Sequence, residues 1–495
     1  MHSSEPARPM LCSPPQLPED HRARVLDKPV TSETPIQPGM TREQRLILVI
    51  AILASFVAFL DGSVINVALP KISEELGGGL TTQQWVVDAY LITLGSLILL
   101  AGSLSDVFGR IVVLRTGLIA FGVASVLIVI APTAELVIIL RALQGIAGAL
   151  LVPSSLALII STFRGAAQAK AIGTWTAWTS ASFLAGPLIG GLFVDYLSWR
   201  LVFAINVIPI SLTLVLLVVL RHKDTRAEGV RLDLVGAALG IVGLGGPVFA
   251  LIEQANFGWA DPRIFVPFVL GLLSFAAFIW WESRVKAPML PLGIFRNRNF
   301  AWGNVATMFI YAALSIGGFI VVIFLQQVAG YPATIAALAF LPVSLGNVFL
   351  SGIFGSLSGK YGPRLFMTAG PIIAGCGYLL LLTMGNDVNY WWNVLPGILV
   401  FAVGISITVA PLTSAILGSI PSQQAGIGSA TNNAVARVAG LIAIALIGVI
   451  VAGQLDVESF HRVLLVTAAL LFLGGIVSFV GIRNPTAPAT TAPEV

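Results

Sequence analysis

Long apolar stretches recur along the 495-residue chain and are separated by short polar segments. Each stretch is roughly 18 to 27 residues long, which matches a helix that crosses a bilayer. Because lipid offers no hydrogen-bond partner to an open backbone, such segments must be helical. The sequence predicts fourteen spans, near residues 46–68, 84–104, 112–131, 136–158, 170–193, 200–220, 232–252, 264–282, 302–326, 333–358, 365–384, 394–417, 425–452 and 463–482.

The composition supports this interpretation by exclusion. The chain is 57% apolar and 10% charged, whereas ordinary soluble domains are about 45–50% apolar and about 25% charged. A water-soluble enzyme and a chain disordered throughout are both excluded. Two cysteines, Cys12 and Cys376, are too few for a disulfide scaffold. The sequence predicts an all-α integral membrane protein surrounded by lipid bilayer, without a cofactor and without a nucleic-acid partner.

The basic residues predict how the chain is oriented. Of the 27 Lys and Arg residues, 21 lie in residues 1–45, in the loops that follow even-numbered spans, or at Arg483. Basic loops face the cytoplasm, so both termini are expected on the cytoplasmic side of the cell's inner membrane. Residues 1–45 contain no apolar run and are predicted to be a disordered cytoplasmic tail rather than a signal peptide. Residues 483–495 are predicted to be a second cytoplasmic tail.

An internal repeat predicts the domain organisation. The loop after the second span, Gly102–Arg110, and the loop after the tenth, Gly355–Arg364, share four identical residues and a second glycine at the same offset. The ninth span therefore begins a second copy of a six-helix unit, and the seventh and eighth spans are a surplus pair, giving a 6+2+6 arrangement. The predicted parts are a first half, two extra helices with linkers, and a second half, at residues 46–220, 221–300 and 301–482.

Several stretches resemble a known family. Segment Gly102–Arg110 resembles the signature of the major facilitator superfamily, which is built from two parallel six-helix halves. The other stretches resemble motifs of proton-driven drug exporters, and they are Leu60–Pro70, Arg141-x-x-Gln144-Gly145 and Gly186-Pro187-x-x-Gly190-Gly191. With fourteen spans, residues 46–482 are similar to the QacA/EmrB-like drug:proton antiporters, which implies a transporter fold and no enzyme activity. Two departures are Ser182, where the family usually has glycine, and Gly359, which replaces Asp106 in the second copy.

Charged residues inside the spans are candidates for proton coupling. Asp61, Arg141, Asp88 and Arg437 all lie within predicted spans, where an unpaired charge costs several kcal/mol. A buried carboxylate can take up a proton when a nearby arginine moves away and release it when the pair reforms. The alternatives are a structural charge or a helix kink near Asn66 for Asp61, a solvated rim position for Asp88, and a fixed counter-ion role for Arg437.

A second group of residues is predicted to form a cytoplasmic gate, and it consists of Gly102, Asp106, Gly109 and Arg110. Asp106 can face a helix N-terminus, and Arg110 can bridge the two halves when the inner side closes. The alternative is that Arg110 only anchors the loop in the cytoplasm, but that leaves Asp106 unexplained.

The fifth span carries the predicted antiporter motif, which consists of Gly173, Gly186, Pro187, Gly190 and Gly191. Proline removes a backbone hydrogen bond and bends the helix, and the glycines allow another helix to approach closely. The family resemblance associates this motif with export rather than uptake. The alternative is plain tight packing.

No phosphate-binding loop, metal-ligand cluster or catalytic constellation is found in the sequence, so the energy for transport must come from an ion gradient. We therefore predict proton-coupled efflux of amphipathic organic compounds or drugs by alternating access. The expected partners are a small amphipathic substrate and protons. Two alternatives stay open, namely an exporter dedicated to one endogenous metabolite or lipid, and a sensor that kept the fold without transport.

Overall fold

The computed structural model describes residues 40–220, 232–421 and 424–484. Within them, fourteen helices are long and apolar enough to cross a membrane, which confirms the predicted number of spans. Most of the two predicted tails, residues 1–39 and 485–495, lies outside the described residues. The predicted first tail is too long, however, because residues 42–45 already belong to the first helix.

The first half and the extra pair comprise nine of the helices in the described ranges. The first half contains α1 (Arg42–Leu76), α2 (Gly79–Phe108), α3 (Arg110–Val129), α4 (Ala134–Thr162), α5 (Gly165–Tyr196), α6 (Leu201–Ala204) and α7 (Val207–Val219). Helices α6 and α7 together form one span. The extra pair is α8 (Leu234–Phe257) and α9 (Pro262–Glu282).

The second half follows a short 3-10 turn at Leu292–Arg296. It contains α10 (Arg298–Gln327), α11 (Ala333–Leu338), α12 (Leu341–Tyr361), α13 (Pro363–Leu380), α14 (Leu395–Leu417), α15 (Ala425–Val451) and α16 (Val457–Gly481). Helices α11 and α12 form one span. Helix α16 begins with a capping box in which Asp456 accepts from the backbone of Ser459 at 2.8 Å, and this bond lowers the pKa of the Asp456 carboxyl.

The repeated segments form two sharp turns rather than the predicted loops. Helix α2 continues through Phe108, and Gly109 alone separates it from α3, with φ of 100°. Gly362 separates α12 from α13 in the same way, with φ of 85°. Only glycine adopts such a conformation at little steric cost. Residues 102–108 belong to α2, and residues 355–361 belong to α12. The two similar sequence segments thus end in the same type of glycine turn.

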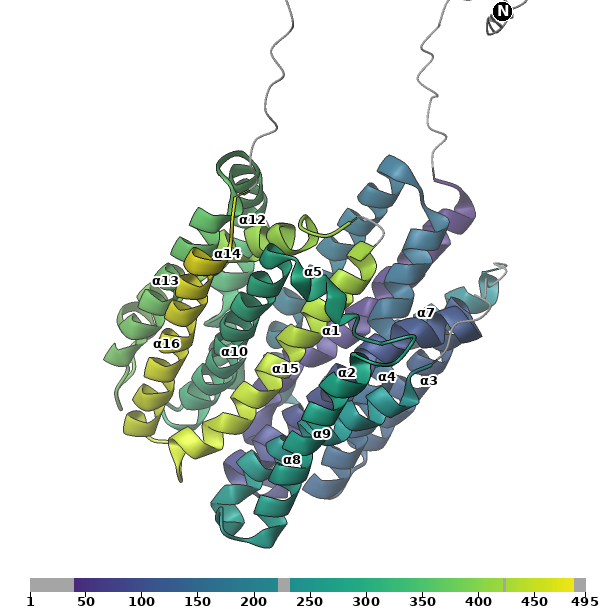
Figure 1. Cartoon of the computed structure of the whole chain (residues 1–495). Coiled ribbons are helices and arrows are strands. Elements are labelled where there is room, and N and C mark those ends of the chain that lie inside the picture. Colours follow the sequence, from purple (N-terminus) through teal and green to yellow (C-terminus); the bar gives the residue numbers. More distant parts are fainter. Residues whose placement is uncertain (1–39, 221–231, 422–423, 485–495) are drawn as a thin grey trace, which may run out of the picture. The chain divides into compact units, whose positions relative to one another are not determined.

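Packing groups the helices into two sets (Figure 1). In the first, α4 packs on α2 and α3, and α5 packs on α1. In the second, α13 packs on α14 and α16, while α10 packs on α15 and α16. Helices α8 and α9 pack against each other, and α8 also contacts α2 and α15. These contacts favour the 6+2+6 arrangement, which stays a prediction.

Hydrogen bonds join the two sets toward one end of the bundle. We name the two ends of the bundle after the residues that begin and end α1, the Arg42 end and the Leu76 end. At the Leu76 end, Gln84 of α2 donates to the Ile444 carbonyl of α15 at 2.6 Å, and Gln326 of α10 donates to the Val67 carbonyl of α1 at 3.2 Å. Near the same end, the Asp195 carboxylate accepts from the first backbone amides of α11 at 2.8 Å. The first and second halves are therefore joined at the Leu76 end.

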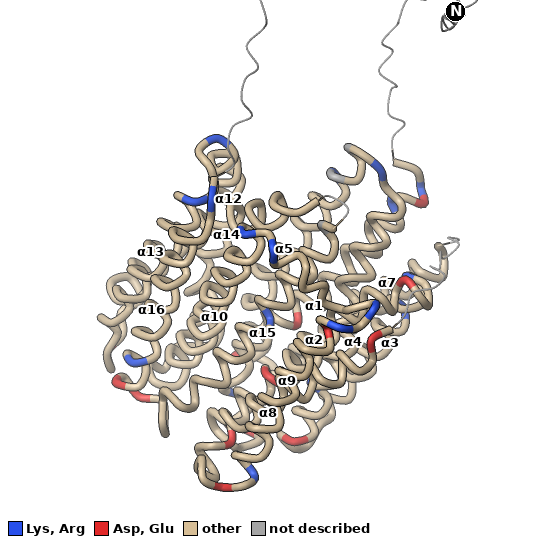
Figure 2. The backbone as a smooth tube through the Cα atoms, viewed as in Figure 1, with Lys and Arg blue, Asp and Glu red and all other residues tan. Residues whose placement is uncertain are grey.

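Charged residues are rare inside the bundle. Figure 2 shows that most Lys, Arg, Asp and Glu residues lie toward the ends of the helices, and few lie between them. The few interior charges include Asp61 and Arg141, each with a side chain 1% exposed. Because buried charges are stable only when they are paired or hydrogen-bonded, these positions are the first to consider as a functional site.

Candidate functional site

An ion pair lies in the interior of the first half. The Arg141 Nη1 of α4 donates to the Asp61 Oδ2 of α1 at 2.5 Å, and both side chains are 1% exposed. The Arg141 Nε also donates to the Val86 carbonyl of α2 at 2.9 Å. Arginine remains charged in proteins, so its charge here is balanced by the Asp61 carboxylate. The structure therefore brings together two of the four predicted coupling residues, Asp61 and Arg141.

Additional polar groups hold this pair in place. Gln144 accepts from Arg141 at 2.9 Å and donates to the Ser125 hydroxyl at 2.8 Å. The amide of Asn206, at the start of α7, donates to the Asp61 Oδ1 at 3.0 Å. Asn206 is not among the predicted site residues, although an amide in an otherwise apolar span is a signal that could have identified it.

The glycine of the Arg141-x-x-Gln144-Gly145 motif explains how these groups meet. A Cβ on Gly145 would collide with the Tyr90 carbonyl and the Thr93 hydroxyl of α2. Helices α2 and α4 can therefore approach closely at this level, which brings Arg141 within reach of the α2 backbone. The Tyr90 ring also lies against the guanidinium, with its centroid 4.4 Å away.

A central cavity of about 530 Å³ lies between the first and second halves, next to the ion pair. Arg141 and Gly62 line it, whereas the Asp61 carboxylate lies behind them. The cavity also reaches Thr413 of α14 and Ser429 of α15, close to the Arg42 end of the bundle. Its volume falls within the roughly 300–1,000 Å³ typical of small-molecule sites.

The other two predicted coupling residues do not join the ion pair. Asp88 of α2 is 0% exposed, and neither carboxylate oxygen has a hydrogen-bond partner in the described residues. Helix α2 begins at Gly79, earlier than the predicted span, so Asp88 lies more than two turns inside the helix. The alternative of a solvated rim position therefore does not fit this conformation. Arg437 lines the central cavity, and its Nε donates to Asn433 at 3.4 Å.

The predicted gate residues lie at the Arg42 end. Gly102 and Asp106 are in the last two turns of α2, while Gly109 forms the turn to α3. The Arg110 guanidinium donates to the Asp106 carboxylate at 3.4 Å, and the Asp106 side chain is 44% exposed. The two charged residues of this group are therefore in contact with each other.

The predicted antiporter motif contacts two neighbours of α5, namely α1 and the second half. A Cβ on Gly186 or Gly190 would collide with Ser63 or Val64 of α1, so both glycines allow α1 and α5 to pack closely. A Cβ on Gly191 would lie 2.5 Å from the Thr334 Cα of α11 in the second half. Gly173, in contrast, has open space around it. The motif thus contains packing positions within and between the halves.

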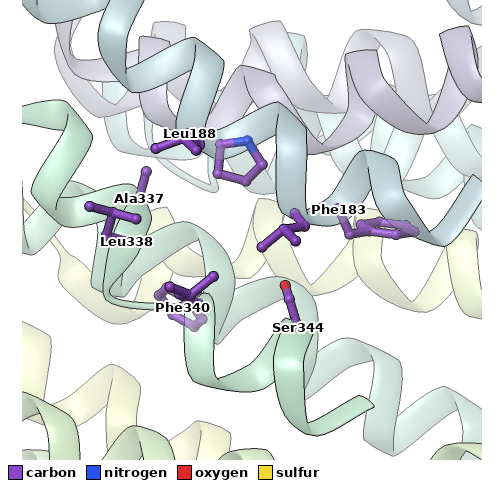
Figure 3. A pocket seen from close by; sticks show the side chains of 9 residues that line it. Phe183, Leu188, Ala337, Leu338, Phe340 and Ser344 are labelled. Carbon is purple, nitrogen blue, oxygen red and sulfur yellow. The ribbon is translucent and has the colours of Figure 1, made fainter. Parts of the chain in front are cut away.

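The region around Pro187 belongs to an apolar seam between the halves. A cavity of about 200 Å³ beside the central cavity shares Gly62, Asn66 and Phe183 with it and also reaches Pro187. Along the same stretch of α5, side chains of the two halves face each other across a void of about 30 Å³ (Figure 3). The side chains labelled in that figure are Phe183, Leu188, Ala337, Leu338, Phe340 and Ser344. Apolar contacts therefore close the interface between the halves along α5.

Gly191→Ala should weaken the closed Leu76 end, because the added methyl group meets the backbone of α11 and separates it from α5. We expect the fraction of molecules closed at this end to fall several-fold. Spin labels at Leu197 and Ile335, in a background without Cys12 and Cys376, would report the distance between the halves. Gly173→Ala is the matched control, since it changes the same helix in open space. Identical distance distributions in both variants would contradict this role of Gly191.

A bundle of fourteen candidate spans with a cavity between two halves defines the class of membrane transporters. The family model described as Major Facilitator Superfamily matches residues 51–444, so the chain belongs to this superfamily. It is a multi-pass membrane transporter rather than an enzyme, as predicted. This match confirms the superfamily that the sequence motifs predict.

Two relatives and one solved structure illustrate the similarity. The puromycin resistance protein pur8 of Streptomyces alboniger is 33% identical over 441 residues, which cover 86% of this chain and 86% of that protein. The multidrug resistance protein Stp of Mycobacterium tuberculosis is 31% identical over 418 residues, which cover 84% and 78%. The crystal structure of an auto-inhibited POT family peptide transporter matches with a TM-score of 0.67 at 15% identity, over 91% of this chain and 99% of that one. The structural match shows the shared fold.

Proposed function

We propose that the protein exports amphipathic organic compounds across the cell membrane in exchange for protons. The observation that carries this proposal is the Asp61–Arg141 pair, which is buried at the edge of the central cavity. Its carboxylate is the titratable member, because arginine does not lose its proton in proteins. In this proposal, Asp61 either carries a proton or pairs with Arg141, but not both at once. A coupled cycle requires such an exchange.

The energetics favour such an exchange. Separating a buried ion pair and leaving one charge unpaired costs about 3–5 kcal/mol. Protonation of Asp61 removes that cost for the carboxylate, so a conformational change that separates the pair favours proton uptake. Restoration of the pair favours proton release. Proton binding and the change of access are thereby linked through the same two side chains.

The nature of the exported compounds is supported by the relatives and by the cavity. Relatives at about 30% identity are named as resistance proteins for puromycin and for multiple drugs. A central cavity of about 530 Å³ has room for a drug-sized molecule. We infer drug efflux rather than a sensor role because both members of the ion pair are present and Arg141 lines the cavity.

The conformation fits one state of an alternating-access cycle. The halves are joined by hydrogen bonds at the Leu76 end, and the cavity reaches toward the Arg42 end. The basic loops favour a cytoplasmic position for the Arg42 end and for both termini. On that basis the described state accepts substrate from the cytoplasm. The Asp106–Arg110 turn would close this end in the opposite state. In this proposal, α8 and α9 are the extra pair of a 6+2+6 bundle.

Proteoliposomes with an imposed pH gradient would test the proposed function. Export of several unrelated amphipathic compounds, accompanied by proton movement in the opposite direction, is the expected result. Coupled export of a single compound would instead indicate a dedicated exporter. Export without any proton movement would refute the antiport mechanism, and no export of any compound would support a sensor.

Asp106→Ala should slow turnover several-fold without changing substrate affinity. The variant removes the Asp106 carboxylate that accepts from Arg110 at the Arg42 end, so the state closed at that end should become less populated. Labelling rates of cysteines placed at Thr413 and Leu197, toward opposite ends, would measure this shift after removal of Cys12 and Cys376. Glu135→Ala, an exposed carboxylate in the first turn of α4, is the control. Unchanged ratios of the two labelling rates would rule out the gate.

A further inference from the structure

The walls of the central cavity differ in chemistry. The wall from the first half is mainly apolar, with Phe59, Ile65, Val87, Leu91 and Phe183. The wall from the second half carries most of the polar side chains, namely Tyr311, Ser315, Thr413, Ser429, Asn432, Asn433 and Arg437. A ligand that fills this cavity therefore meets an apolar surface on one side and hydrogen-bonding groups on the other.

Arg437 carries the one charge on the polar wall. Its Nε donates to the Asn433 side chain on the same helix at 3.4 Å, and it forms no ion pair with any described residue. The Cβ of Arg437 lies against α2, where a Cβ on Gly95 would be 3.8 Å away. The start of the side chain is thus packed against α2. The remaining N–H donors of the guanidinium are available to a ligand in the cavity.

Neighbouring hydroxyl groups add further donors. Tyr311, Ser315 and Ser429 line the cavity, and their hydroxyls make no hydrogen bond to other groups in the described chain. Asn432 is different, because its amide donates to Asn304 at 3.1 Å and to the Thr307 hydroxyl at 2.9 Å. These unused donors therefore line the same cavity as Arg437, and a ligand rich in acceptor oxygens would satisfy them.

The electrostatic balance of the cavity is positive. All of its lining residues are described, and none of them is Asp or Glu. The charge of Arg141 is balanced by Asp61, whereas the charge of Arg437 has no partner among the described side chains. A cationic ligand would be repelled by this wall, and an anionic ligand would supply a counter-ion for the half-buried Arg437 guanidinium.

We propose that the cavity binds amphiphiles with an anionic oxygen group, such as a carboxylate, sulfonate or phenolate. The anionic group binds Arg437 and the surrounding hydroxyls, and the apolar body lies against Phe59 and Phe183. Arginine suits this task because its planar group can donate two parallel hydrogen bonds to two oxygens. This inference rests on the proposed export function and names its substrate class. It gives Arg437 a role in substrate binding rather than in proton coupling.

Binding to the purified protein in lipid nanodiscs, without any pH gradient, tests the inference. The probes are anilinonaphthalene sulfonate as the anionic amphiphile and tetraphenylphosphonium as the cationic one, with empty nanodiscs as blanks. The wild type should bind the anionic probe more tightly than the cationic one. Arg437→Gln should weaken binding of the anionic probe roughly tenfold to a hundredfold, as expected for loss of a charge-assisted hydrogen bond. Arg437→Lys should retain part of that affinity.

The controls separate a local effect from a general loss of charge or of fold. Arg263→Gln removes the same charge at the start of α9, outside the cavity, and should leave both probes unaffected. Tighter binding of the cationic probe by the wild type would overturn the inference. An equal loss of both probes in Arg437→Gln and Arg437→Lys would also overturn it. Because no gradient is present, the binding preference can hold even when export proves not to be proton-coupled.

Discussion

Asp61→Asn is expected to abolish uphill export while the protein remains inserted in the membrane. Asparagine has nearly the same volume and can still accept a hydrogen bond, but it cannot take up or release a proton at neutral pH. The variant also leaves the Arg141 guanidinium, 1% exposed, without its counter-ion. Inside-out vesicles with an imposed pH gradient would measure export, which should fall to the level of vesicles without the protein.

The cost of the unpaired arginine predicts a second effect of Asp61→Asn. Removing one partner of a buried ion pair typically costs about 3–5 kcal/mol, so thermal stability in detergent should also decrease. Substrate binding measured without a gradient should persist, because Asp61 does not line the cavity. Asp261→Asn is the control, since it removes a carboxylate from the loop before α9. Gradient-driven export at the wild-type rate by Asp61→Asn would disprove the coupling role.

The number of spans was predictable because it depends on local properties alone. An apolar run of sufficient length has to be helical in lipid, whatever its neighbours are. The limits of the helices were less predictable. Helix α2 begins at Gly79, before the predicted span, and includes Gln83, because a helix can continue beyond the apolar run when its polar side chains find partners. The Gln83 amide finds one in the Ser73 hydroxyl of α1, to which it donates at 2.7 Å.

The ion pair was predictable for a related reason. A charge in an apolar span is so costly that Asp61 and Arg141 had to be paired or functional. The sequence could not show that Asn206 completes the pair, because that contact depends on how α6 and α7 pack against α1. Asp195 was missed as well, since its role as an acceptor for the first amides of α11 arises only when the halves meet.

The surroundings of Asp88 and Arg437 were the least predictable. The sequence groups both residues with Asp61 and Arg141, because all four are charges inside predicted spans. A shared place in apolar spans does not determine contact, however, and the structure leaves Asp88 without a hydrogen-bond partner in its described part. Arg437 faces the cavity instead of a carboxylate. Which helix face meets the cavity is a tertiary property that a single apolar span does not encode.

Arg141→Ala is expected to stop coupled transport completely. The truncated side chain can no longer approach the Asp61 carboxylate, whose remaining hydrogen-bond donor in the described residues is Asn206 at 3.0 Å. Without a positive partner, no conformational change alters the balance between the protonated and the ionised carboxylate. Export and proton movement, recorded together in proteoliposomes over a range of pH values, should both be at background. Export by the alanine variant equal to wild type at every pH would make Arg141 a packing residue.

Arg141→Lys and a double variant separate charge from geometry. Lysine keeps the positive charge but cannot bond Asp61, Gln144 and the Val86 carbonyl at once, as arginine does. We expect export roughly tenfold slower than wild type, which corresponds to about 1.4 kcal/mol, with a shifted pH optimum. Asp61→Asn combined with Arg141→Ala leaves no unpaired charge from this pair. It should therefore be more stable to heat than either single variant, although it should remain inactive. Strictly additive losses of stability would mean that the two residues do not act as a pair, and the electrostatic mechanism would then fail at its first step.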